Sequence, residues 1–98
     1  MVLPIFDPAL PWRLSPQVSI RPESFGALLY HFGNRKLSFL KARSLLSLVK
    51  ALDKHPSVYA ALDATDIPSE QHHAHLAALG NLARSDIIIQ EVSDDHIT

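Results

Sequence analysis

The fold of this chain is decided by one stretch, which runs Gln17-Val-Ser-Ile-Arg-Pro-Glu-Ser-Phe-Gly-Ala-Leu-Leu-Tyr-His-Phe-Gly-Asn-Arg-Lys-Leu-Ser-Phe-Leu40. It holds three runs rich in apolar and β-branched or aromatic residues, the composition of half-buried strands. Pro22-Glu23-Ser24 predicts a turn after the first run, and Gly33-Asn34 is a typical hairpin dipeptide after the second. The stretch therefore predicts a three-stranded antiparallel β-meander.

The lengths of the turns set the register of such a meander. A two-residue loop at 33–34 pairs Tyr30 with Leu37 and Leu28 with Phe39, and a three-residue loop at 22–24 places Val18 opposite Leu28. One apolar face is then expected to collect Val18, Ile20, Leu28, Tyr30, Leu37 and Phe39. The opposite, wetter face is expected to hold Leu29, His31, Lys36 and Ser38. The third strand ends the sheet and keeps a free edge.

Residues 42–84 change to helical spacing. An apolar stripe at i, i+3, i+4 and i+7 predicts a first helix that ends near 54–56 and buries Leu45, Leu48, Val49 and Leu52. Ser57 can cap a second helix through about Asp63, and a third is expected over 69–84, with a stripe of Leu76, Leu79, Leu82 and Ala83. The segment 87–89 is either a strand or a core segment. The fold class is therefore α+β, with three strands followed by three helices.

A chain of 98 residues is long enough for one domain. Residues 1–16 contain four prolines and predict a proline-rich N-terminal arm, residues 17–90 a single domain, and residues 91–98 a flexible acidic tail. The chain has no apolar run of about 18 residues that would cross a membrane and no signal-peptide pattern at its start. We therefore expect a cytoplasmic protein.

The composition excludes several kinds of chemistry. There is no cysteine, so disulfides, iron–sulfur ligation and thiol nucleophiles are absent. There are only three glycines, and no phosphate-binding or nucleophile motif occurs. A hydrophobic fraction of 47% also excludes a disordered linker. We expect a folded protein that is not an enzyme and carries no cofactor.

Two histidines of the third predicted helix raise the question of a metal. His72 and His75 lie three residues apart and so share one side of a helix, where two imidazoles could bind zinc. Further ligands at a matching spacing are missing, and histidine is common on polar helix faces. We therefore expect no metal site.

Charge is divided between the two halves of the chain. Residues 1–52 hold seven basic and two acidic side chains, a balance of +5, and residues 53–98 hold two basic and eight acidic ones, a balance of −6. The stretch 35–50 contains five basic residues and no acid. This charge can discourage aggregation at the free edge, guide an acidic partner to it, or do both. A winged-helix DNA-binding regulator is the alternative function. Its recognition helix would be the third, which begins with Glu70 and carries its one arginine, Arg84, at the far end.

The residues from Trp12 to Lys41 resemble a known family. Arg21-Pro-Glu23, Phe25-Gly-Ala-Leu-Leu-Tyr30 and Arg35-Lys-Leu-Ser-Phe-Leu40 are similar to segments of the mycofactocin biosynthesis chaperones, which are PqqD-like precursor-peptide recognition proteins. The resemblance extends from Trp12 to Arg84. It implies a winged helix-turn-helix-like fold, the RiPP recognition element, in which a three-stranded sheet packs on three helices.

The resemblance also implies a function, namely binding the leader of the mycofactocin precursor peptide and presenting it to a radical S-adenosylmethionine (radical SAM) maturase. The leader is expected to add as a strand to the third strand, in a groove closed by the third helix, so that a proline at Ser38 should block binding more than folding. For Leu40, Leu76 and Leu79, ordinary core packing is the alternative role. The implied peptide-binding residues are Arg35, Lys36, Leu37, Ser38, Phe39, Leu40, Lys41, His72, His75, Leu76 and Leu79.

Overall fold

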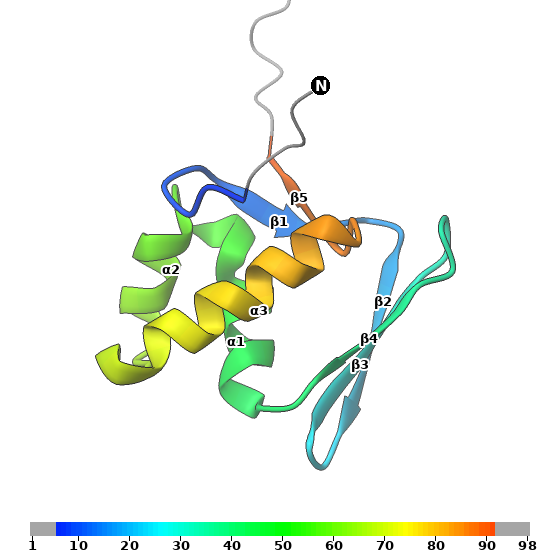
Figure 1. The fold of residues 1–98 in the computed structure, drawn as a ribbon, viewed down its shortest axis with the longest axis horizontal. Helices are drawn as coiled ribbons and strands as arrows, with labels where there is room; N and C mark the ends of the chain where they lie inside the picture. The colour runs from blue at the N-terminus through cyan, green and yellow to red at the C-terminus, as the bar shows by residue number, and fades with distance from the viewer. Residues whose placement is uncertain (1–5, 92–98) are drawn as a thin grey trace, which may run out of the picture.

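A computed structural model of the chain describes residues 6–91. Three strands, β2 (Val18–Glu23), β3 (Gly26–His31) and β4 (Leu37–Leu40), form an antiparallel sheet in the order β2-β3-β4. Figure 1 shows this sheet on one side of three helices that follow it in the chain. The predicted α+β fold, a meander followed by three helices, is confirmed.

The register of the two hairpins agrees with the prediction in one case and not in the other. Tyr30 pairs with Leu37 and Leu28 with Phe39, as expected. Val18, however, lies opposite His31 and not opposite Leu28. The β2–β3 turn consists of residues 24–25, because Pro22 remains within β2, where its nitrogen faces the open side of an edge strand and needs no ladder hydrogen bond.

This shift of three positions changes which face of the sheet is buried, because side chains alternate along a strand. The predicted apolar face is wrong in this respect. The face that packs against the helices holds Val18, Ile20, Ala27, Leu29, His31, Ser38 and Leu40. Leu28, Tyr30, Leu37 and Phe39 lie on the opposite face, which we call the outer face.

One glycine fixes the start of β3. Gly26 has φ of 151°, and a Cβ atom there would lie 2.0 Å from the carbonyl oxygen of Leu40. No other residue type fits such a close approach at such a φ. Gly26 therefore lets the end of β4 pass directly beside the β2–β3 turn.

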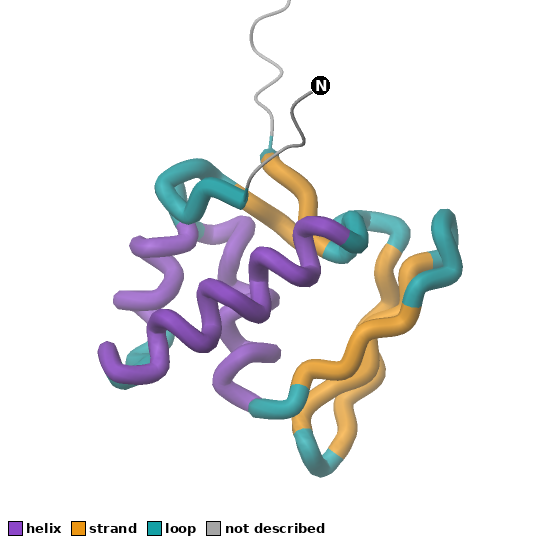
Figure 2. Tube along the Cα trace, viewed as in Figure 1, coloured by secondary structure: helices purple, strands orange, loops and turns teal. Residues whose placement is uncertain are grey.

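The helices occur close to where the sequence predicts them. Helix α1 (Arg43–Ala51) continues into the 3₁₀ turn η1 (Leu52–Lys54), α2 is Val58–Ala64, and the turn η2 (Ser69–Gln71) leads into α3 (His72–Arg84). The hydroxyl of Ser57 accepts a hydrogen bond from the N–H of Ala60 at 3.1 Å, so its predicted capping role is confirmed. Figure 2 shows the three helices on one side of the molecule and the three-stranded sheet on the other.

A second, two-stranded sheet was not predicted. β1 (Trp12–Leu14) pairs antiparallel with β5 (Ile88–Gln90). The segment that precedes β2 in the chain therefore meets the segment that follows α3. Trp12 is buried, its Nε1 donates to the carbonyl of Asp7 at 2.9 Å, and its ring lies 5.0 Å from that of Phe6. Residues 6–16 of the expected arm are thus packed on the domain. The rest of that arm and positions 92–98 of the expected tail lie outside the described residues.

The core fills the space between the inner sheet face and the helices. Its fully covered side chains come from both sheets and all three helices, and the largest are Leu29, Leu40, Leu48, Leu52, Leu62, Leu79, Ile87, Ile88, Val49 and Val58. Because the core covers only the inner face, both the outer face and the free side of β4 remain accessible.

Candidate functional site: the edge of β4 and its groove

The free edge of the sheet is β4, which has β3 on one side and no strand on the other among residues 6–91. The N–H of His31 donates to the carbonyl of Lys36 at 2.9 Å, and hydrogen-bonded pairs alternate along an antiparallel ladder. The backbone groups of Ser38 and Leu40 therefore point toward β3. Those of Leu37 and Phe39 point away from the sheet, where an added strand would meet them.

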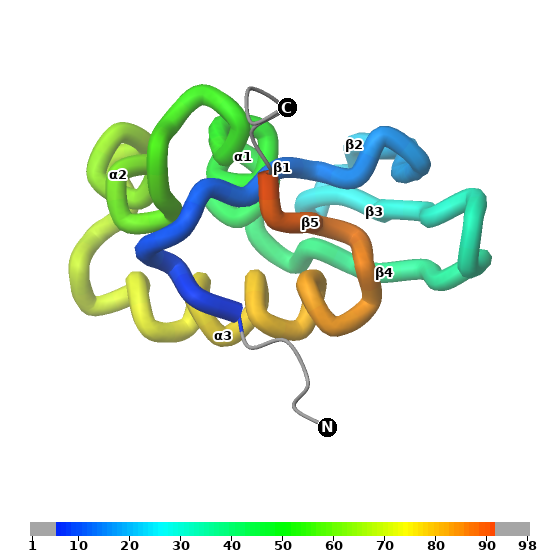
Figure 3. The backbone as a smooth tube through the Cα atoms, turned by 90° about the horizontal axis from the view of Figure 1, so that it is seen from above, coloured from blue at the N-terminus to red at the C-terminus, as the bar shows by residue number. Residues whose placement is uncertain are grey.

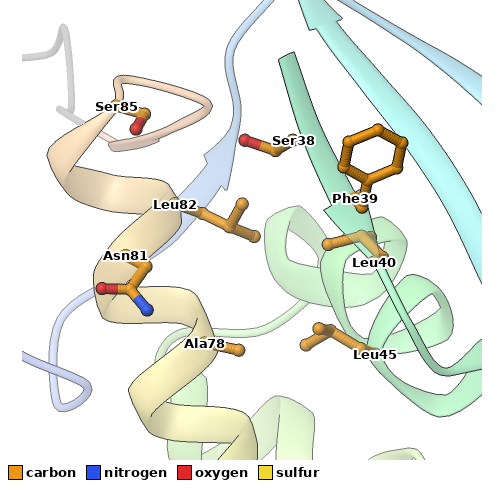
Figure 4. A pocket seen from close by; sticks show the side chains of 8 residues that line it. All are labelled: Ser38, Phe39, Leu40, Leu45, Ala78, Asn81, Leu82 and Ser85. Carbon is orange, nitrogen blue, oxygen red and sulfur yellow. The ribbon is translucent and has the colours of Figure 1, made fainter. Parts of the chain in front are cut away.

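A groove runs between β4 and α3. Figure 3 shows β4 as the strand of the sheet that lies on the side of α3. Its lining carries no charged side chain and consists of Ser38, Phe39, Leu40, Leu45, Ala78, Asn81, Leu82 and Ser85, all drawn in Figure 4. Its volume is about 230 Å³. Since a cavity of about 150 Å³ holds a benzene molecule, the groove has room for one aromatic or two small aliphatic side chains.

Two hydrogen bonds mark the ends of the groove. At one end the side-chain amide of Asn34 donates to the carbonyl of Ser85 at 3.0 Å, and at the other the hydroxyl of Ser44 lies 2.9 Å from Nε2 of His75. β4 and α3 therefore run in opposite directions. His75 and Ser85, the residue that follows α3, are ten positions apart, about 15 Å of helix, which matches about four residues of an extended peptide.

The loop between β3 and β4 is held in one shape by its own hydrogen bonds. Nδ1 of His31 accepts the N–H groups of Gly33 and Asn34 at 3.0 and 3.1 Å, so this nitrogen carries no proton. The residue in the left-handed region is Arg35, with φ of 63°, rather than Gly33 or Asn34. The loop is longer than the predicted two-residue turn, although the register it produces is the predicted one.

The predicted peptide-binding residues of β4 lie in three different places. Ser38, Phe39 and Leu40 line the groove, and Leu37 presents its backbone at the edge. Arg35, Lys36 and Lys41 are exposed just beyond the two ends of β4. Because Ser38 donates its N–H within the ladder, the expectation that a proline there blocks binding more than folding is wrong for this geometry.

The predicted residues of α3 lie outside the groove lining. Nε2 of His72 is 2.7 Å from the carbonyl of Ile67, and Nδ1 of His75 is 2.9 Å from that of Gln71, so both rings have structural partners. Leu79 is part of the core and Leu76 packs against it. Their role in peptide binding stays a prediction.

The sequence interpretation missed five residues of the groove, namely Leu45, Ala78, Asn81, Leu82 and Ser85. Four of them follow the helical spacing i, i+3, i+4 and i+7 from Ala78. That spacing was visible in the sequence. The direction in which α3 crosses β4 was not, and it brings the second half of the helix to Ser38.

The site offers free backbone groups on β4 and an uncharged groove beside them. Residues 6–91 hold no group of three or more His, Cys, Asp or Glu side chains that could bind a metal ion. Within the same residues, no helix is long and apolar enough to cross a membrane. An open strand edge beside an uncharged groove defines a small α+β binding domain.

The chain belongs to the peptide chaperone MftB family, whose sequence model matches residues 11–89. It is 49% identical over 89 residues to the peptide chaperone MftB of Mycobacterium ulcerans (strain Agy99), covering 91% of this chain and 82% of the relative. It is 50% identical over 84 residues to the peptide chaperone MftB of Mycolicibacterium smegmatis, and the match covers 86% of this chain and 82% of that relative. The resemblance stated from the sequence is confirmed. The names describe a non-catalytic role, in agreement with the prediction that the chain is not an enzyme.

One solved structure shares the fold. A chain in the crystal structure of E. coli MccB with succinimide superposes with a TM-score of 0.57 over 87% of this chain and 25% of that longer one. At 18% sequence identity, the similarity concerns the fold alone.

Proposed function

We propose that this protein binds the leader of the mycofactocin precursor peptide as an additional strand on β4 and presents the peptide to a radical SAM maturase. The observation that carries the proposal is the free backbone of Leu37 and Phe39, directly beside an uncharged groove. Main-chain hydrogen bonds hold a strand of almost any sequence, and pockets for alternate side chains select among sequences.

The groove supplies the affinity that the backbone bonds lack. Each such bond contributes about 0.5–1.5 kcal/mol net, and ordering a flexible peptide costs several kcal/mol. Burial of one large apolar side chain adds about 1.5–3 kcal/mol. The proposed leader therefore has an apolar residue that enters the groove between Leu40 and Leu82, flanked by residues that pair with β4.

Amide hydrogen exchange tests strand addition residue by residue. With ¹⁵N-labelled protein and a synthetic mycofactocin precursor peptide at saturation, the amides of Leu37 and Phe39 should exchange at least tenfold more slowly. The amides of Ser38 and Leu40, already bonded to β3, serve as internal controls. Saturated peptide binding with unchanged exchange at Leu37 and Phe39 contradicts strand addition.

A pair of alanine positions on α3 tests the groove. Ala78→Phe fills the groove with an aromatic ring and should raise the Kd for the peptide at least tenfold. Ala77→Phe places the same ring at an exposed position outside the lining and should leave the Kd unchanged. Equal effects of the two substitutions contradict the proposal.

Tight binding of duplex DNA, with a steep salt dependence, would instead support the winged-helix regulator.

A further inference from the structure

The outer face of the sheet carries an exposed apolar patch that peptide binding at the edge does not explain. Six large apolar side chains stand exposed among residues 6–91, and four of them are on this side of the sheet. Their exposed fractions are 43% for Phe25, 58% for Phe32, 51% for Leu37 and 57% for Phe39. We call these four residues, with the half-buried Leu28 and Tyr30, the outer patch.

The outer patch is continuous from the β2–β3 turn to the β3–β4 loop. The rings of Phe25 and Phe39 are 6.3 Å apart, and those of Tyr30 and Phe32 are 5.8 Å apart. At about 200 Å² for a whole phenylalanine, the exposed parts of the three rings alone come to about 300 Å². Patches of several hundred Å² mark sites of protein interaction, and a standard interface buries about 800 Å² on each partner.

The border of the outer patch is basic. Arg35, Lys36 and Lys41 are exposed around it, and in the described part of the chain none of them forms a salt bridge. Arg21, on the same face, is paired with Glu23 at 2.9 Å, so the face's acidic group is already neutralised. Two copies joined through this face would bring basic borders together, which disfavours self-association. The border instead fits a partner surface with carboxylates around an apolar centre.

Alternate side chains of β4 point to opposite sides of the sheet, so that the groove and the outer patch share only Phe39. Ser38 and Leu40 point to the side of α3, and Leu37 and Phe39 point to the outer face. Figure 4 shows Ser38 directed toward α3 and the ring of Phe39 on the other side of the strand. A peptide on the edge would cover only the row of the outer patch next to β4. Phe25 and Phe32 would stay available to a second molecule.

We infer that the outer patch is the docking surface for the enzyme that modifies the peptide, and that this enzyme contacts it through an apolar surface bordered by carboxylates. The inference rests on the proposed function for the identity of the enzyme. β4 then serves two partners at once, with the peptide at its edge and groove and the enzyme on the outer face. Such an arrangement holds the peptide next to the enzyme, which contacts the part of the outer patch that the peptide leaves uncovered.

The test uses two phenylalanines that lie outside the groove and the edge. The double substitution Phe25→Ser and Phe32→Ser removes both rings, and Tyr59→Ser removes an exposed ring of α2 as a matched control. Binding of the purified mycofactocin radical SAM maturase and of the synthetic precursor peptide is measured separately by calorimetry, and folding by circular dichroism. We expect the Kd for the enzyme to rise at least tenfold in the double variant and the Kd for the peptide to change less than twofold. Tyr59→Ser should change neither.

The outcomes separate this inference from the proposed function. A folded double variant that binds the enzyme as the wild type does overturns the inference and leaves peptide binding untouched. If the wild type binds the enzyme but not the peptide, and the double variant no longer binds the enzyme, the proposed function alone is overturned. Concentration-dependent dimerisation of the wild type in sedimentation, abolished in the double variant, would assign the outer patch to a second copy and overturn the inference.

Discussion

A proline at position 39 is the most direct test of strand addition. Phe39 has its backbone N–H on the free side of β4, so Phe39→Pro removes one donor from the edge and none from the ladder with β3. Proline is tolerated on edge strands at positions whose nitrogen faces away from the sheet, as Pro22 demonstrates in β2. The substitution should therefore leave the fold intact.

The expected loss in affinity follows from one missing hydrogen bond. The bond itself contributes about 0.5–1.5 kcal/mol, and a peptide carbonyl left unpaired in a dry interface costs up to about 3 kcal/mol. Taking the cost of the unpaired carbonyl alone, about 1–3 kcal/mol, the expected increase in Kd is about 5- to 150-fold. Because proline also removes the aromatic ring, the comparison is made with Phe39→Ala, which loses the ring and keeps the N–H.

Calorimetry with the synthetic precursor peptide measures both variants, and urea denaturation measures their stability. Ser38→Pro is the structural control, because its N–H belongs to the ladder and its loss should destabilise the domain by about 1–3 kcal/mol. The reasoning is refuted when folded Phe39→Pro binds the peptide with the same Kd as Phe39→Ala. It is also refuted when Ser38→Pro is as stable as Phe39→Pro.

Three further predictions concern the parts of the structure that hold β4 in place and surround it. Gly26→Ala should cost at least about 2 kcal/mol in urea denaturation because of its φ and its contact with the neighbouring backbone, whereas Gly80→Ala, with ordinary contacts inside a helix, should gain about 0.5–1 kcal/mol. A gain for Gly26→Ala would contradict the geometry. Asn34→Asp keeps the oxygen that accepts the N–H of Lys36 but loses the donor to α3, and thermal denaturation should show a loss of about 1 kcal/mol. Arg35→Glu combined with Lys36→Glu should weaken binding of an acidic leader in calorimetry, more at low salt than at high salt. An effect independent of salt would exclude electrostatic guidance.

The elements that local sequence specifies were predictable. The helices follow from apolar spacing and from the cap at Ser57, and the β3–β4 register follows from the position of Gly33-Asn34 between two strands. The free edge of β4 followed from the sequential order of the strands. Each of these features depends on residues that are close together in the chain.

The elements that depend on tertiary contacts were not predictable in the same way. Pro22 has the local appearance of a turn residue, and only its place on an edge strand lets it remain in β2. β1 is three residues long and finds its partner, β5, at the other end of the domain. The groove residues of α3 depend on the direction in which the helix crosses β4, which no local pattern encodes.

The register of β4 is a functional property as well as a structural one. A slip by one residue would exchange the two faces of the strand, turning the side chain of Phe39 toward the helices and that of Ser38 to the outer face, and would turn the edge N–H groups toward β3. The contact of Gly26 with Leu40 and the bond from Asn34 to Ser85 hold the strand at both ends against such a slip. A strand of four residues has few ladder bonds to resist it. Loosening either end should therefore weaken binding at the edge and at the outer patch together, before the helices unfold.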